Sequence, residues 1–439
     1  MRIIELLIVF LLSSSVALWG WTELPAALKI VLVVALALGY IGVLLRPGGK
    51  PPADSRRLRR IKRGTELIWI GGFSAASEIV LLVLWFLKAE AGVTARIFAV
   101  VTPVLLIGLI LFAGVVRTAA GSKQIKIKDH VFMMMFWWLP VVNIFLIRKF
   151  YKTAKREYFF ELDKAELDSA RAENSVCATR YPVLLVHGIF FRDWQLVNYW
   201  GRIPAALIRN GAKIFYGRQQ SAQSVPASAE ELKKTIEAVI RETGAEKVNI
   251  IAHSKGGLDS RYAISRLGMD KYVATLTTIN TPHKGCDMVD YLLDRLPKGF
   301  VDFVTRRYNR IFTVLGDTAP DFMGGVNDLS AVRARDYVTE MPDMEGVSYR
   351  SCMSVMSSAG SAGIPLNLGY LLIRKLNGPN DGLVWEESAK HGDYRLITTP
   401  QKRGVSHGDV IDLMRENIDN FDVREFYVGL LKELKEQGY

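Results

Sequence analysis

The segment from Val248 to Gly257 constrains the fold of this chain more than any other part of the sequence. It reads VNIIAHSKGG, a short apolar run followed by small residues around Ser254, and a helical pattern continues to Arg266. A strand that turns this tightly into a helix strains the backbone of the serine, and larger flanking side chains would collide with neighbouring elements. The pattern predicts a serine exposed at the carboxyl edge of a parallel sheet. The alternative is a chance serine in a tight turn.

The same alternation continues through the second half of the chain. Strand patterns at 183–187, 212–216, 247–252 and 273–279 alternate with helical patterns such as 228–243. Alternating strands and helices form a mostly parallel sheet with helices on both faces. We therefore expect an α/β domain over residues 179–439.

Candidate partners for Ser254 come later in the chain. An unassisted serine hydroxyl is a poor nucleophile, so it needs a base, and the base needs an acid to orient it. The segment NDGLV presents Asp381, and the segment VSHGD presents His407. Asp381 also lies in Pro-Asn-Asp-Gly, which is strong turn chemistry, so a plain turn residue is the alternative. The rival acids nearby are Glu386, Glu387 and Asp393.

The chain has six histidines, and their positions narrow the choice of base. His253 precedes the serine on a strand that should point its side chain away, and His283 comes too early, directly after the next strand. His391 precedes the strand-like YRLITT, so we expect it on a connecting helix. His407 lies in a loop before the helix-like DVIDLMREN and is the favoured base.

In the order of these motifs, and in the tract at 327–351, the chain resembles the bacterial triacylglycerol lipases of the Pseudomonas and Burkholderia type. The resemblance covers roughly residues 180–420 and implies an α/β-hydrolase domain, in which nucleophile, acid and histidine follow in this order. It implies a triad of Ser254, Asp381 and His407. Backbone N–H groups of Ile189, in a His-Gly turn, and of Lys255 are the implied oxyanion hole. We expect the Lys255 side chain to be solvated.

The resembling lipases also hold a structural calcium ion with two aspartates, and one of them lies two residues after the catalytic histidine. Asp409 occupies that position, but residues 356–380, where the other is expected, contain no Asp or Glu. Because calcium needs several oxygen ligands, we expect the site to be degraded or absent and the protein to need no cofactor.

Apolar residues are concentrated in the first 150 positions. Four apolar segments are each long enough to cross a hydrocarbon core of roughly 30 Å; they lie at about 3–21, 25–45, 67–87 and 97–116. A fifth segment, 131–147, is shorter and contains Pro140 and Asn143. We expect residues 1–150 to form an all-α transmembrane region with four or five spans.

The net positive charge belongs to this region. Residues 1–156 hold 21 Lys and Arg against 7 Asp and Glu, so the excess marks juxtamembrane loops and does not indicate a nucleic-acid partner. Basic runs at 56–63 and 122–128 mark cytoplasmic sides. A further basic run after residue 147 favours a segment 131–147 that is interfacial or re-entrant. The chain would then have four spans, with the hydrolase domain on the cytoplasmic face. If 131–147 crosses, the domain lies outside.

Two further segments complete the predicted organisation. Residues 151–178 read as a charged helical linker. Residues 287–323 interrupt the strand–helix alternation with one or two amphipathic helices, whose apolar faces carry Leu292, Leu293, Leu296, Phe300, Phe303 and Val304. In the resembling lipases this insertion is a lid that opens on lipid; the alternative is ordinary core helices.

These features predict a membrane-embedded serine hydrolase that cleaves carboxylic esters of membrane lipids, acylglycerols or phospholipids, through an acyl-enzyme. A thioesterase or an acyltransferase of the same fold is the alternative within enzymes. A non-catalytic scaffold with a hydrolase fold is the alternative outside enzymes, and the intact order of serine, acid and histidine argues against it.

Overall fold

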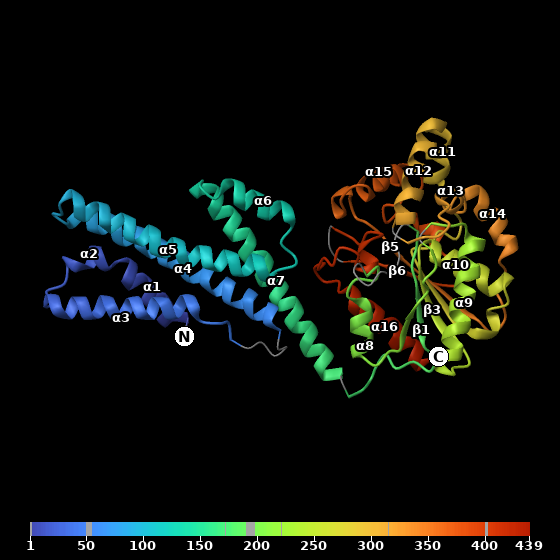
Figure 1. Ribbon diagram of the computed structural model, residues 1–439, viewed down its shortest axis with the longest axis horizontal. Coiled ribbons are helices and arrows are strands. Elements are labelled where there is room, and N and C mark those ends of the chain that lie inside the picture. The colour runs from blue at the N-terminus through green and yellow to red at the C-terminus, as the bar shows by residue number, and fades with distance from the viewer. Residues whose placement is uncertain are drawn as a thin grey trace. The chain divides into compact units, whose positions relative to one another are not determined.

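The computed structural model describes residues 2–49, 55–171, 173–189, 198–220, 222–314, 316–399 and 403–439 (Figure 1). The chain divides into two compact units, Met1–Ser169 and Ala170–Tyr439. The last two residues of the 181–191 motif lie outside the described residues.

Unit 1 is entirely helical in its described part. Its helices are α1 (Arg2–Ser13), α2 (Ser15–Trp19), α3 (Ala26–Leu45), α4 (Arg56–Lys88), α5 (Val93–Gly121), α6 (Ile127–Phe136) and α7 (Pro140–Arg171). Among the described residues, α3, α4 and α5 are long and apolar enough to cross a membrane. Their apolar side chains are largely exposed, as Leu38 and Leu105 illustrate at 66% each. Such surfaces fit a hydrocarbon environment better than water.

Two of the expected spans take a different form. The segment at 3–21 divides between α1 and α2 at Ser14, whose hydroxyl donates a hydrogen bond to Glu78 Oε2 at 2.6 Å. The segment at 131–147 divides between α6 and α7 because the chain turns before Pro140, a residue that favours a helix start. Lys149 on α7 reaches back to Asp129 on α6 at 2.6 Å, so these two helices form a hairpin.

Unit 2 is built on a six-stranded sheet with the order β2-β1-β3-β4-β5-β6. The strands are β1 (Val183–Val186), β2 (Ile214–Tyr216), β3 (Val248–His253), β4 (Val273–Ile279), β5 (Ser348–Ser354) and β6 (Asp393–Ile397). Each pairing along this order is parallel. The predicted α/β class is therefore confirmed, and the carboxyl ends of the central strands meet at one edge.

Helices cover both faces of the sheet, and alternate side chains of β1 pack into the hydrophobic cores on the two faces. Leu185 packs with Leu207 of α8 (Ile203–Arg209) and Leu431 of α16 (Val423–Glu436). Leu184 packs with Ile236 of α9 (Val225–Thr243) and Ile264 of α10 (Lys255–Arg266). Burial on both faces explains why the central strands are apolar throughout.

The segment between β4 and β5 holds α11 (Asp287–Arg295), α12 (Lys298–Val314), α13 (Phe322–Asn327) and α14 (Ala331–Glu340), and α15 (Leu366–Leu376) follows β5. Figure 1 shows α11, α12 and α15 at one end of unit 2. Short 3₁₀ turns complete the described elements: η1 (Asp270–Tyr272), η2 (Ala359–Ser361), η3 (Glu386–Ala389) and η4 (Asp409–Ile411).

Candidate active site

Ser254 lies at the corner between β3 and α10, where the backbone turns sharply. Its φ of 54° and ψ of −131° are strained values for a residue with a side chain. The flanking glycines leave no room for larger residues. A Cβ at Gly256 would lie 2.4 Å from the carbonyl oxygen of His187, and one at Gly257 would lie 2.2 Å from Thr281 Oγ1. Crowding by the adjacent loops therefore imposes the small residues seen in the sequence.

Asp381 and His407 are brought together from two loops. His407 Nδ1 lies 2.6 Å from Asp381 Oδ2, and the His407 N–H donates to the Asp381 carbonyl oxygen at 2.9 Å. Oδ1 of the same carboxylate accepts the N–H groups of Leu383 and Val384, each at 2.8 Å. Asp381 thus closes a turn through Oδ1 and contacts the His407 imidazole through Oδ2, so its contacts are compatible with both roles considered from the sequence.

The rival residues have other partners. Glu387 pairs with Lys390. Tyr394 donates to Glu386 at 3.2 Å, and the Asp393 side chain is 76% exposed on the edge strand β6. His391 Nε2 lies 2.9 Å from Asp343 Oδ1. His391 occupies the loop between η3 and β6, so the expectation of a connecting helix was wrong.

The serine corner and the His407 loop lie at the same edge of the sheet. The His407 ring centroid is 4.5 Å from that of His253, the residue directly before Ser254. Strands β1 and β3 are neighbours, and a Cβ at Gly188 would approach Ser254 Cβ to 2.8 Å, so the loop after β1 passes against the serine. Ile189 is the next residue of that loop.

The comparisons with known proteins agree with this geometry. A family profile described as palmitoyl protein thioesterase matches residues 182–315. A triacylglycerol lipase of Burkholderia plantarii is 34% identical over 193 residues, which cover 41% of this chain and 53% of that protein. A triacylglycerol lipase of Pseudomonas fragi is 27% identical over 293 residues, 59% of this chain and 98% of that protein. Unit 2 is therefore similar in sequence to bacterial triacylglycerol lipases.

The likeness covers only part of the relatives, and among solved structures it is one of fold alone. The chain spans about half the length of the first curated relatives, 53% of the Burkholderia protein and 56% of a triacylglycerol lipase of Pseudarthrobacter phenanthrenivorans. The crystal structure of Staphylococcus hyicus lipase is 16% identical and covers 59% of this chain and 97% of that chain, with a TM-score of 0.48.

The two candidate oxyanion donors are the backbone N–H groups of Lys255, directly after the serine, and of Ile189, in the loop after β1. Lys255 is the first residue of α10, and N–H groups in the first turn of a helix have no intrahelical acceptor. Its side chain is buried, which corrects the expectation of a solvated lysine. Lys255 Nζ lies 2.5 Å from Asp259 Oδ1 and donates to Ser228 Oγ at 3.0 Å. Burial raises the pKa of Asp259 to about 7, although Lys255 opposes the shift.

Sequence reasoning missed a polar network beneath the serine. Tyr199 Oη lies 2.6 Å from His253 Nδ1 and accepts the N–H of Gly188 at 3.0 Å. Burial, followed by the nearby His407, holds the pKa of His253 well below its usual value. A neutral Nδ1 accepts a hydrogen bond from the Tyr199 hydroxyl, and the hydroxyl oxygen in turn accepts the N–H of Gly188. Alternation along the strand had suggested that His253 points away from the site. This prediction was wrong, because the His253 ring contacts the ring of His407.

Asn280, at the end of β4, is the second residue that the sequence did not reveal. Its backbone φ is 50°, and its Nδ2 donates to Asp381 Oδ2 at 2.6 Å and to Ser354 Oγ at 2.7 Å. Its Oδ1 accepts the Ser354 N–H at 2.8 Å. The only sequence signal was its position at the end of a strand next to the serine strand.

The surroundings of Asp409 do not fit the calcium site of the resembling lipases. Arg403 donates to Asp409 Oδ1 at 3.1 Å, and Ser406 donates to Asp409 Oδ2 through N–H and hydroxyl at 3.0 and 2.8 Å. The guanidinium also pairs with Glu416 at 2.9 Å. A cation already neutralises this carboxylate, and a hard metal ion beside a guanidinium would be repelled.

Proposed function

We propose that this chain is a membrane-embedded serine hydrolase that cleaves carboxylic esters of lipids, acylglycerols or phospholipids, through an acyl-enzyme. The observation that carries the proposal is the 2.6 Å contact between His407 Nδ1 and Asp381 Oδ2, with the His407 ring 4.5 Å from the ring of His253, the residue before the strained Ser254. The kinship with triacylglycerol lipases gives the same reaction class.

The roles follow from the chemistry of each group. Asp381 accepts a hydrogen bond from the Nδ1–H of His407, which leaves Nε2 as the base that takes the Ser254 hydroxyl proton. The serine oxygen attacks the ester carbonyl, and His407 returns the proton to the departing alcohol. Water then repeats the sequence on the acyl-serine. N–H groups of Ile189 and Lys255 hold the oxyanion, a contribution of roughly 3–4 kcal/mol per donor in comparable enzymes.

A fluorophosphonate probe on the full chain in detergent tests the triad directly. We expect labelling of the wild type and none of Ser254→Ala. His407→Ala should lose labelling and ester hydrolysis almost as completely, because triad members act as one unit. Asp381→Asn should lose somewhat less, and His391→Ala serves as the matched histidine control with normal activity. Full hydrolysis by Ser254→Ala would overturn the proposal.

The insertion after β4 supports a substrate taken from the membrane. Among the described residues of α11 none is buried, and in α12 only Phe312 is. Phe300 and Phe303 are 52% and 60% exposed, so part of the apolar surface of α12 faces outward. Val304 and Phe312 of the same helix pack against Phe322. Such a surface suits a mobile lid that opens where it meets lipid.

The membrane embedding rests on α3, α4 and α5, with α1 and α2 as a broken fourth crossing. Because α6 and α7 return as a hairpin, segment 131–147 is interfacial or re-entrant in this proposal. With the positive-inside rule, the proposal then has unit 2 on the cytoplasmic face. A reporter fused after Tyr439 tests the side: fluorescent protein should be active there and alkaline phosphatase inactive. The reverse pattern would place the domain outside.

A thioesterase is the second candidate, because the matching family profile is described as palmitoyl protein thioesterase. The same triad cleaves thioesters, since the thiolate is a better leaving group than an alkoxide. Palmitoyl thioesters and palmitoyl oxyesters of matched chain length, presented in the same micelles, separate the two. A higher kcat/KM on the oxyester supports the lipase proposal, and the opposite order supports the thioesterase.

A further inference from the structure

Helix α7 is fixed on unit 1 by one buried face. Phe150, Ala154 and Glu157 follow the i, i+4, i+7 spacing of a helical stripe, and all three are buried. The Glu157 carboxylate accepts the Lys123 N–H at 3.1 Å and also bonds to Arg57 and Ser122. These contacts hold the helix in place, so its opposite face is presented in a defined orientation.

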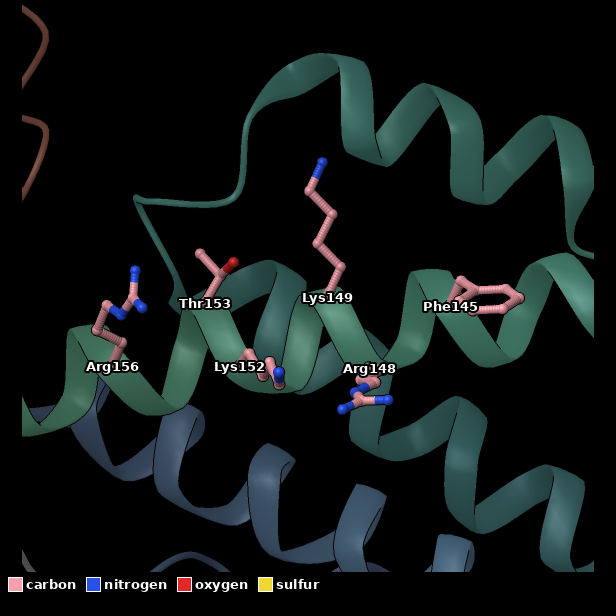
Figure 2. Close-up of a pocket in the computed structure, with 6 residues that line it drawn as sticks. All are labelled: Phe145, Arg148, Lys149, Lys152, Thr153 and Arg156. Carbon is pink, nitrogen blue, oxygen red and sulfur yellow. The ribbon is translucent and has the colours of Figure 1, made fainter. Parts of the chain in front are cut away.

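The opposite face of α7 carries a row of cations. Arg148, Lys149, Lys152 and Arg156, with Phe145 and Thr153, line a shallow pocket of about 330 Å³ (Figure 2). Spacings of three and four residues place these cations on one side of the helix, where like charges repel. Lys149 pairs with Asp129 of α6. Within the described residues, neither Arg148 nor Lys152 has an acidic partner, so a bound anion would relieve the repulsion.

The surface beside this pocket is apolar and aromatic. Six side chains of the α6–α7 hairpin are 63–77% exposed: Met134, Trp137, Trp138, Val141, Ile144 and Phe145. Tryptophan is enriched at the level of lipid headgroups, and basic residues next to it attract anionic lipids. Phe145 belongs to both the apolar surface and the pocket, so the two are continuous. A free anion or an acidic protein would leave the apolar surface unexplained.

We propose that the α7 pocket binds the phosphate of an anionic phospholipid headgroup, whose acyl chains lie along the apolar surface of the α6–α7 hairpin. The guanidinium of Arg148 offers a planar pair of donors to phosphate oxygens, and Lys152 adds a point charge one turn later. The site belongs to unit 1, whereas Ser254 belongs to unit 2. It rests on the membrane association proposed above but does not require ester hydrolysis.

The test uses the full chain in neutral detergent with the Ser254→Ala substitution, so that no ligand is consumed and the result is independent of catalysis. Dioctanoyl phosphatidylglycerol, dioctanoyl phosphatidylcholine and inorganic phosphate are titrated separately, and binding is followed by native mass spectrometry. We expect phosphatidylglycerol to bind at least tenfold more tightly than the other two. Arg148→Gln with Lys152→Gln should weaken its binding at least tenfold.

Two control variants make the result specific. Lys88→Gln with Arg96→Gln removes the same amount of charge from two exposed positions, the last residue of α4 and the first turn of α5. This pair should leave binding unchanged. Arg148→Lys with Lys152→Arg keeps the charge and should retain binding. Equal weakening by both glutamine pairs would show a general charge effect and overturn the site. Equal affinity for phosphatidylcholine or for inorganic phosphate would overturn the anionic lipid as the ligand.

Discussion

Asn280 donates a hydrogen bond of 2.6 Å to the same carboxylate oxygen of Asp381 that faces His407. Its own amide is held by Ser354 on β5, through bonds of 2.7 and 2.8 Å. The acid is therefore positioned by the end of the sheet and not only by its own turn. A fixed carboxylate keeps the imidazole in one tautomer and orientation.

We predict that Asn280→Ala lowers kcat by roughly 10- to 100-fold, the equivalent of one hydrogen bond to a charged group. The KM for a soluble ester should change little, because Asn280 lies behind the acid and away from the substrate. Asn280→Asp should be worse, since a second carboxylate repels Asp381. Steady-state kinetics with a melting curve for each variant check this. An unchanged kcat in Asn280→Ala would remove the positioning role.

The insertion at 287–323 should affect the hydrolysis of lipid substrates and not that of small soluble esters. For the wild type, turnover of a long-chain ester should rise when the ester is presented in bilayers or micelles. Phe300→Asp with Phe303→Asp should abolish most of this rise. A soluble short-chain ester should be hydrolysed almost normally, because it needs only transient opening. Val332→Asp with Val338→Asp on α14, at 66% and 67% exposure, provides the matched control. Equal losses on both esters, with a lower melting temperature, would show that α12 is a core helix.

We expect Arg403 to stabilise the loop around His407 in place of the calcium ion that the resembling lipases hold there. Wild-type activity and melting temperature should survive exhaustive chelation, because a bound ion would otherwise stabilise the native state by mass action. Arg403→Met should lower the free energy of unfolding by about 1–3 kcal/mol, since the substitution leaves the buried Asp409 carboxylate without its cation. Added calcium should not restore the loss. A fall in melting temperature with chelator that calcium reverses would contradict this prediction.

Acid should destabilise unit 2 through its buried histidines. Burial, followed by the neighbouring Arg261, holds the pKa of His283 well below its usual value. Below about pH 6.5 the unfolded chain binds a proton that the native state does not, so stability falls as pH falls, by up to about 1.4 kcal/mol per pH unit. Thermal unfolding midpoints between pH 7.5 and 5 should drop less for His283→Gln than for the wild type. Parallel pH profiles for the two proteins would contradict the assignment.

The sequence alone determined the parts of the protein that depend on local pattern. The strands β1 to β4 and helix α9 were placed within a few residues because their apolar periodicity and turn residues are local signals. The serine corner was visible for the same reason, since steric crowding at Gly256 and Gly257 restricts the residue types. The pairing of Asp381 with His407 was predicted from the order of the motifs together with the resemblance to bacterial lipases, and the structure has the two side chains in contact.

Only the tertiary structure decided contacts between residues far apart in the chain. Asn280 supports Asp381 across 101 positions, and Tyr199 supports His253 across 54, at spacings that carry no periodic signal. The buried pair of Lys255 with Asp259, and Arg403 beside Asp409, are likewise invisible in composition, because burial decides whether a charged side chain is solvated or paired. The break at Ser14 and the turn before Pro140 are further cases. Hydropathy measures the length of an apolar segment, whereas packing against neighbouring helices decides whether it continues as one helix.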